Sequence, residues 1–257
     1  MSRDSRLVAS SASLAYTCLS STSFFPPEVN DSPPAASARR KQAERSALSD
    51  RRMTDAAVEL LVGQGLDGTT LAGIGRAAGY SRGLASQRFG SKAGLLRNVL
   101  KRASQEWLRR LDLAVGGKVG LEALEAALDS QVGFIREAPN DVRAMYLLWF
   151  QSIDPGAEYR PNVAEVHRRQ RETVAGWIRQ GRARGLVATT ADPATLAEYY
   201  CAAVAGIVFH WLVNRDFELE SAVSEMKAEL GLRLRPAGEQ TTGLQQTGIV
   251  RARIDHD

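Results

Sequence analysis

The hydrophobic pattern of the chain is helical from about residue 46 almost to its end. Apolar residues recur three and four positions apart, as in Met53, Ala57, Leu60 and Leu61, which is the spacing of one face of an α-helix. No segment alternates apolar and polar residues as a half-buried strand does, and no internal repeat is present. The pattern therefore predicts an all-α fold of about nine helices.

Turn signals set the limits of these helices. Gly63 and Gly65 are expected to end the first helix. Asp192 and Pro193 begin the eighth, with aspartate as the N-cap and proline in the first turn. We expect helices at residues 46–62, 70–77, 81–88, 91–115, 121–136, 141–152, 161–184, 193–213 and 218–233.

The two ends of the chain differ from the helical middle. Residues 1–40 are rich in Ser, Ala and Pro, and residues 237–257 in Gly, Thr and Gln, so we expect a disordered extension and a disordered tail. The basic run at residues 38–41 is either a flexible arm or the start of the first helix. Between these ends we expect a helix-turn-helix domain at residues 41–103 and a helical effector-binding and dimerisation domain at residues 104–236.

The positive charge of the chain is concentrated in one segment. Residues 37–103 hold 13 Lys and Arg against 5 Asp and Glu, a net formal charge of +8, whereas the whole chain has a net charge of +4. Residues 104–257 hold 18 against 21 and are slightly acidic. A basic module beside a near-neutral body is typical of nucleic-acid-binding proteins, although a solvated basic face has the same composition.

Composition argues against several other classes of protein. Cys18 and Cys201 are too few for a disulfide framework and fit a reducing compartment. No segment reads as a membrane span of about 20 apolar residues, and the serine-rich stretch after Arg3 and Arg6 does not read as a secretory signal. We therefore expect a cytoplasmic protein that has no membrane partner.

Residues 69–92 have the pattern of a helix, a tight glycine turn and a second helix. Thr70 is expected to cap the first of these helices and Ser81 the second, while Gly79 supplies the positive φ of the turn. Leu84 or Ala85 points back at the core. An ordinary αα-hairpin shares this turn, but the order of caps and the basic charge favour a helix-turn-helix, whose second helix enters the DNA major groove.

Polar residues of the second helix and of the next helix start form the candidate DNA-binding site. Arginine pairs with guanine and glutamine with adenine in the major groove, whereas ammonium groups and free amides at helix starts bind phosphate. The candidates are Thr70, Ser81, Arg82, Ser86, Gln87, Arg88, Ser91 and Lys92.

An ordered series of residues carries a family resemblance across this segment. It comprises Ala56-Ala57, Leu60-Leu61, Gly65, Thr69-Thr70, Ile74, Ala78-Gly79, Ser81-Arg82-Gly83, Phe89, Ser91-Lys92 and Leu95-Leu96. On these residues the stretch from residue 51 to residue 96 resembles the N-terminal domain of the TetR family of transcriptional regulators. The rest of the chain is similar in its helical layout and in details such as Gly185, Asp192-Pro193, Gly206 and Trp211.

The resemblance implies a homodimer that binds a palindromic operator, usually as a repressor released by a small ligand. It places Thr70 and Lys92 at the family's phosphate contacts, and Arg82 and Gly83 where the family reads bases. The chain departs from the family at Ser86, where an aromatic is common, and at Arg88, where His or Tyr is common. The roles of those aromatics are therefore not transferred.

The body carries two further candidate surfaces. Aromatic residues of the middle helices are candidates to line an apolar effector cavity, although a filled core is the alternative for each of them. These residues are Trp107, Phe134, Tyr146, Trp149, Phe150 and Trp177. The helix after Asp192 is apolar nearly all round and must be covered on more than one side, by a second subunit or within a monomer core. The candidate dimer residues are Ala203, Gly206, Ile207, His210 and Met226.

Two other functions compete with a ligand-responsive regulator. An enzyme is disfavoured because the chain has no Cys/His cluster, no phosphate-binding glycine loop and no Gly-x-Ser-x-Gly elbow. We accordingly expect no metal and no cofactor. A DNA-binding architectural protein that has no sensor remains the alternative, and it predicts a solid core in the body.

Overall fold

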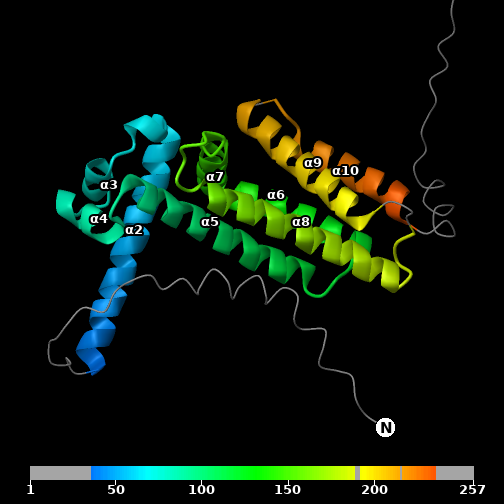
Figure 1. Ribbon diagram of the computed structural model, residues 1–257, viewed down its shortest axis with the longest axis horizontal. Coiled ribbons are helices and arrows are strands. Elements are labelled where there is room, and N and C mark those ends of the chain that lie inside the picture. The colour runs from blue at the N-terminus through cyan, green and yellow to red at the C-terminus, as the bar shows by residue number, and fades with distance from the viewer. Residues whose placement is uncertain (1–35, 189–191, 215, 236–257) are drawn as a thin grey trace, which may run out of the picture. The chain divides into compact units, whose positions relative to one another are not determined.

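The structure is a computed structural model, and it describes residues 36–188, 192–214 and 216–235. These residues form α-helices joined by turns and contain no strand (Figure 1). The helices are α2 (Ala36–Gly68), α3 (Leu71–Ala77), α4 (Arg82–Phe89), α5 (Lys92–Val115), α6 (Gly120–Glu137), α7 (Pro139–Gln151), α8 (Arg160–Ala183), α9 (Pro193–Val213) and α10 (Leu219–Leu234). The all-α fold expected from the hydrophobic pattern is thus confirmed.

The first helix is longer at both ends than expected. α2 begins at Ala36, inside the stretch expected to be disordered, and the helical run continues to Gly68. Residues 36–45 are rich in Ala, Arg, Lys and Gln, which have high helix propensities. The prediction that Gly63 ends the helix is wrong, because the backbone departs from helical geometry only at Gly65, with φ 71°. Of the expected disordered segments, residues 1–35 and 236–257 lie outside the described part of the chain.

The other helices begin and end within two residues of their expected limits. At α9 the expected cap is present, since the Asp192 carboxylate accepts a hydrogen bond of 3.0 Å from the amide of Thr195. Pro193 follows in the first turn, where it displaces no hydrogen bond.

The described chain forms two compact units. The first comprises residues 36–113 and 130–169, and the second comprises residues 114–129 and 170–235. This division follows backbone contacts and does not coincide with the functional boundary expected between residues 103 and 104.

The first unit contains a head of α2 to α5 built around a small apolar core. α3 packs on α4 and on α2, and α2 also packs on α7. Met53, Ile74, Ala85 and Leu95, one from each of these four helices, are 0% exposed. Such complete burial holds the two short helices α3 and α4 in fixed positions on the longer ones.

The second unit is held together by close helix contacts. α9 packs on α10, and the Tyr200 hydroxyl donates a 3.0 Å hydrogen bond to the carbonyl of Leu124 on α6. Gly181 of α8 lies so near Gly120 that a Cβ at Gly181 would be 2.5 Å from the Gly120 Cα. Only glycine permits backbones to approach so closely.

Candidate DNA-binding site and effector region

The turn between α3 and α4 has the geometry of a helix-turn-helix. The Thr70 hydroxyl accepts a 3.0 Å hydrogen bond from the amide of Gly73 and so caps α3, as expected. Gly79 has φ 78°, the left-handed conformation that glycine adopts without strain. The amide of Tyr80 closes the turn with a 2.8 Å bond to the carbonyl of Gly75.

α4 has a buried side and an exposed side. Of the two residues expected to face the core, Leu84 and Ala85, it is Ala85 that is fully buried. Gly83, Ser86 and Gln87 are exposed, and no atom lies within 4 Å of a Cβ built at Gly83. The Arg82 side chain lies outside the described part of the structure, although its backbone is the first residue of α4. The exposed side is therefore small and polar.

Ser81 does not cap α4 as expected. It occupies the N-cap position, but its hydroxyl makes no hydrogen bond to the amides of the first turn. Its backbone, at φ −64° and ψ 153°, is extended, and its carbonyl accepts the first helical bond from Leu84 at 3.2 Å. The hydroxyl is exposed and remains a candidate phosphate contact.

The start of α5 packs tightly against the end of α4. The Ser91 hydroxyl accepts a 3.0 Å bond from the amide of Gly94, which confirms it as a cap. A Cβ at Gly94 would lie 2.1 Å from the carbonyl oxygen of Phe89, so no side chain fits there. The Lys92 ammonium donates a hydrogen bond to the carbonyl of Leu66 near the end of α2. An ammonium has three donors, so this bond leaves two for a phosphate.

Arg88 is engaged within the head. Its Nε lies 2.8 Å from Oδ1 of Asp50 on α2. The pair is an ion pair, and its geometry does not meet that of a hydrogen bond. Because the Arg88 side chain is still 32% exposed, a phosphate contact through the same guanidinium is compatible with this pairing.

One arginine joins three helices of the first unit. Arg102 on α5 pairs with Asp55 on α2, and its other terminal nitrogen lies 2.9 Å from Asp141 on α7. Nearby, the Asn140 amide donates a 3.2 Å bond to Glu59 on α2. Sequence reasoning missed this connection because the two carboxylates lie 47 and 39 residues from Arg102, where no local pattern predicts pairing.

Five of the six candidate effector residues lie in the first unit, and three of them form a cluster on α7. The ring of Tyr146 is 4.8 Å from that of Trp149 and 6.3 Å from that of Phe150. The ring of His167 on α8 lies 4.5 Å from Trp149. Sequence reasoning did not associate this histidine with the aromatics, because α7 and α8 meet only in the folded chain.

The other three candidates lie elsewhere. Phe134 is fully buried beneath the Arg110 guanidinium, which is 5.5 Å from the ring centroid. The indole N–H of Trp107 donates a 2.9 Å bond to Gln131. Trp177 belongs to the second compact unit. Phe134 is thus a core residue, which is the alternative that the sequence left open for each aromatic.

Tyr146 is a buried residue whose hydroxyl has no partner in the described chain. The residue is 5% exposed, and its hydroxyl makes no hydrogen bond to any described residue. Burial raises the pKa of this hydroxyl well above its usual range, so it stays protonated at neutral pH. The hydroxyl oxygen itself is not fully enclosed, so it can donate a hydrogen bond to an effector that carries an acceptor.

α9 is more exposed than its composition suggests. Its buried positions are Ala197, Tyr200, Val204 and Val208, a single stripe. Among its apolar residues, Tyr199 is 50%, Phe209 38% and Val213 64% exposed. Ala203, Gly206 and Ile207 are partly exposed, and His210 is exposed. Met226 on α10 is 8% exposed and belongs to the buried side of that helix.

The length and composition of α9 set it apart from the other described helices. Pro193–Val213 is long and apolar enough to cross a membrane by those two criteria, with a mean hydropathy of 1.5, although it is not free of charge because it contains Glu198. The core helix of a soluble protein passes the same test. Only 22% of the residues in the apolar window are buried within the chain.

Little in the described chain points to catalytic or metal chemistry. Among the described residues, no group of three or more His, Cys, Asp or Glu side chains is placed to hold a metal ion. Burial raises the pKa of the Cys201 thiol to about 11. The nucleophilic thiolate is therefore scarce at neutral pH.

Comparison with known proteins supports the helix-turn-helix assignment. Residues 53–99 match the family described as "Bacterial regulatory proteins, tetR family". The HTH-type transcriptional regulator SrpR of Pseudomonas putida is 25% identical over 179 residues, which cover 69% of this chain and 81% of SrpR.

Solved structures of regulators share the fold. A TetR transcriptional regulator from Chloroflexus aurantiacus J-10-FL has a TM-score of 0.66 and 24% identity, and the match covers 77% of this chain and all of that one. A putative transcriptional regulator from Saccharomonospora viridis in complex with choline has a TM-score of 0.66 and 18% identity, over 74% of this chain and 99% of that one. The complex of SmeT with triclosan has a TM-score of 0.63 and 18% identity, over 81% and 99%.

These matches agree with the geometry of the head. The matched residues 53–99 contain α3, the glycine turn, α4 and the first turns of α5. The matched residues lie inside the basic segment 37–103 and themselves hold 5 Lys and Arg against 3 Asp and Glu. Residues 53–99 are therefore a helix-turn-helix DNA-binding domain of the tetR family of bacterial regulatory proteins, and the chain as a whole is similar to transcriptional regulators of that family.

Proposed function

We propose that the protein is a ligand-responsive repressor that binds a palindromic operator as a homodimer and is released by a small apolar effector. The observation that carries the proposal is the exposed, small and polar side of α4, held on a fully buried helix-turn-helix core. DNA binding is assigned to residues 41–103, and effector binding and dimerisation to residues 104–236. The proposal includes no catalytic step and places the protein in the cytoplasm, with the DNA.

We assign two roles at the DNA, base reading and phosphate binding, to two groups of residues. Arg82, Gly83, Ser86 and Gln87 lie on α4, and we assign them to base reading in the major groove. Phosphate contacts set the register of a protein on DNA without reading its sequence. We assign this role to Thr70, Ser81, Arg88, Ser91 and Lys92.

The exposure of α9 supports the homodimer. A helix that is apolar nearly all round but buries one stripe leaves apolar surface that a partner must cover. A second copy of the same helix covers it with self-complementary surface in a two-fold dimer. Such symmetry matches a palindromic operator, whose half-sites lie about one DNA turn, 34–36 Å, apart.

The cluster on α7 supports an apolar effector. Tyr146, Trp149 and Phe150 offer ring faces to an apolar molecule, and the unpartnered Tyr146 hydroxyl offers one hydrogen bond. Two structural relatives bind small molecules, namely triclosan in SmeT and choline in the Saccharomonospora viridis regulator. SmeT itself is described as the repressor of a multidrug efflux pump of Stenotrophomonas maltophilia.

Selection of DNA from a random-sequence pool by the full-length protein tests the operator proposal. We expect a palindromic sequence to be enriched. Gln87→Ala should relax the preference at one position of each half-site by about 1–3 kcal/mol, because it removes a base contact. Lys92→Ala should instead weaken all duplexes about equally. Failure to enrich any sequence, or a changed sequence preference in Lys92→Ala, would contradict the assignment.

Effector release separates the regulator from an architectural protein that has no sensor. We expect an apolar aromatic compound such as triclosan to displace the protein from its selected duplex. Tyr146→Phe should weaken this response without changing DNA affinity in the absence of the compound. If no member of an apolar compound library weakened DNA binding, the architectural alternative would be favoured.

A further inference from the structure

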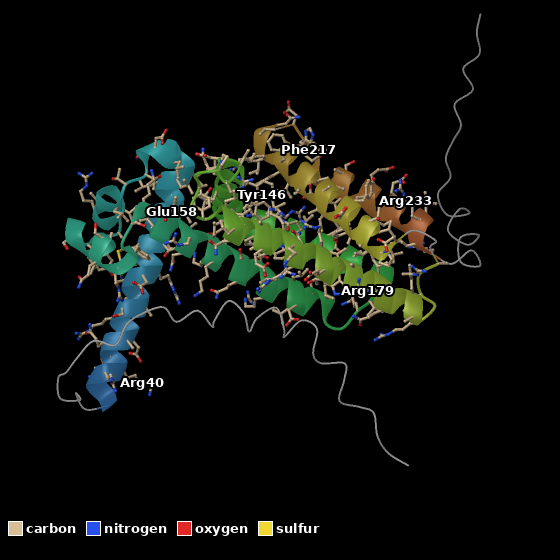
Figure 2. All side chains as sticks on the ribbon, viewed as in Figure 1. Arg40, Tyr146, Glu158, Arg179, Phe217 and Arg233 are labelled. Atoms are coloured by element: carbon tan, nitrogen blue, oxygen red, sulfur yellow. The ribbon has the colours of Figure 1, made fainter. Side chains whose placement is uncertain are left out.

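The first turns of α2 form a positively charged helix that the described chain leaves uncovered. Residues 39–45, here called the basic extension, are all exposed. They contain Arg39, Arg40, Lys41 and Arg45 against Glu44, a net charge of +3. Figure 1 shows this end of α2, in blue, projecting beyond α3 and α4, and Figure 2 labels Arg40 on it. Burial of α2 begins only at Ser49, which is 8% exposed.

The basic extension has few internal contacts to hold it. A helix that is polar on all sides is stabilised by side-chain pairs or by a partner. The extension has one ion pair, between Arg40 and Glu44 at 3.4 Å, and both side chains are largely exposed. Such surface pairs contribute little. Arg39, Lys41 and Arg45 make no ion pair with any described residue, so their charges are available to a polyanion.

The position of the basic extension favours DNA as this polyanion. The ion pair between Arg88 and Asp50 puts Asp50 beside the end of α4, the proposed recognition helix. Arg39 precedes Asp50 by 11 residues on the same helix, a distance of about 16 Å at 1.5 Å per residue. DNA carries one phosphate charge per about 1.7 Å of its axis, so a cation at this distance from α4 meets phosphates outside the groove that α4 occupies.

The extension also continues a charged face of the head. Lys41, Arg45 and Arg52 are four and seven residues apart, which places them on one face of α2. Arg52 is exposed and belongs to the part of α2 that packs in the head. One stripe of cations therefore runs from the head into the extension.

We propose that the basic extension is a second DNA contact, which binds backbone phosphates flanking the half-site and does not read sequence. The proposal rests on the proposed DNA-binding function and adds to it a site outside the helix-turn-helix. Its cations release condensed counterions when they neutralise phosphates, so the site contributes affinity that falls with salt. The length and charge of the basic extension set the number of flanking phosphates that it can contact.

The salt dependence of DNA binding by a triple variant tests the proposal. Arg39→Gln, Lys41→Gln and Arg45→Gln are combined in the full chain, because glutamine removes charge and keeps helix propensity. The probe is a labelled mixed-sequence duplex of about 30 base pairs, titrated between about 50 and 200 mM salt. The slope of log K against log salt should become shallower by about 0.9 for each phosphate that the variant no longer neutralises, or about 2.7 for each chain.

A matched variant controls for the change in net charge. Arg179, Arg182 and Arg184 are exposed residues at the end of α8 and just after it, and they make no ion pair with described residues. Their triple substitution by glutamine removes the same charge and should leave the slope at its wild-type value. Thermal unfolding of both variants should match the wild type, since neither set is packed.

The outcomes separate this proposal from the broader one. A slope in the extension variant equal to that of the control would overturn the second contact, as would a change in the DNA sequence that the variant selects from a random pool. If the variant kept its DNA slope but no longer bound phosphatidylglycerol vesicles, the partner would be an anionic membrane and the DNA assignment would be wrong. If the wild-type chain bound the mixed-sequence duplex but selected no sequence, the operator proposal alone would fail.

Discussion

At the residue scale, Gly83 is a position of α4 where helix stability and the proposed DNA contact make opposite demands. It lies in the interior of an eight-residue helix, is exposed, and is not among the glycines with positive φ. Nothing lies within 4 Å of a Cβ built there. Glycine in a helix interior costs about 0.5–1 kcal/mol relative to alanine. The fold does not require this glycine, whereas close contact with a groove would.

We therefore expect Gly83→Ala to raise the free energy of unfolding by about 0.5–1 kcal/mol and to weaken DNA binding. Urea unfolding and binding to the selected duplex measure the two effects. Gly133→Ala on α6 is the matched control, because its Cβ also meets no atom within 4 Å. It should stabilise the protein similarly without altering DNA affinity. Unchanged DNA affinity in Gly83→Ala would contradict the proposed orientation of α4.

At the scale of elements, the polar contacts of Arg102 connect the head to α7. α2 is part of the head, and α7 contains the aromatic cluster. Arg102 pairs with a carboxylate on each of these two helices. α2 also packs directly on α7. A displacement of α7 by an effector would therefore act on α2 through existing contacts, without a separate linking segment. Under the proposed function, these contacts would carry a change at the aromatic cluster to the head.

Arg102→Met should lower the free energy of unfolding by about 1 kcal/mol, because it removes two partly exposed ion pairs of up to about 1 kcal/mol each while keeping the apolar stem. Lys101→Met is the control on the same helix, since Lys101 is exposed and has no described partner. Its effect should be within about 0.5 kcal/mol. A double-mutant cycle with Asp141→Asn then isolates the α5–α7 contact. Additive effects in that cycle would exclude coupling through this pair.

At the scale of the whole molecule, the described part of the chain leaves apolar surface of α9 exposed. Tyr199, Phe209 and Val213 are each at least 38% exposed. A second subunit and a membrane are two environments that would cover such residues. The Tyr200 bond to Leu124 and the packing on α10 hold α9 within the second compact unit. Because α9 is held by these contacts to other helices of the unit, we favour a second subunit over a membrane as its cover.

Gly206→Leu should convert the dimer to a monomer at micromolar concentration. The protomer accommodates the side chain because no atom lies within 4 Å of a Cβ at Gly206, but two closely packed α9 helices would be forced apart. Sedimentation equilibrium measures the change. Gly63→Leu on α2, which is equally open and exposed, should leave the association unchanged. A wild-type chain that is already monomeric, or that partitions with membranes, would rule out the proposed interface.

Local patterns were sufficient for most of the fold. The limits of α3 to α10 follow from glycine, proline and capping residues, whose effects extend over a few neighbours. The two errors in the head have local causes as well. Gly63 does not end α2, because a helix tolerates an isolated glycine, and the residue type of Ser81 does not by itself make its hydroxyl a cap.

The candidate site was less predictable than the fold. The sequence identified Thr70 and Ser91 as caps, and the hydroxyls of both bond the expected helix starts. It could not show that Lys92 bonds the carbonyl of Leu66, or that Arg88 pairs with Asp50. These partners lie 26 and 38 residues away, so only the packing of α2 against the following helices brings them together.

The sequence by itself thus determined the helices, the glycine turn, the basic head and the resemblance of the head to the TetR family, because each depends on residue type at short spacing. The tertiary structure alone decided which side of α4 is exposed, which aromatics gather on α7, how Arg102 joins three helices, and that the start of α2 is uncovered. These features depend on burial and on contacts between residues far apart in the chain. Both are set when helices pack, and neither is encoded in the spacing of neighbouring residues.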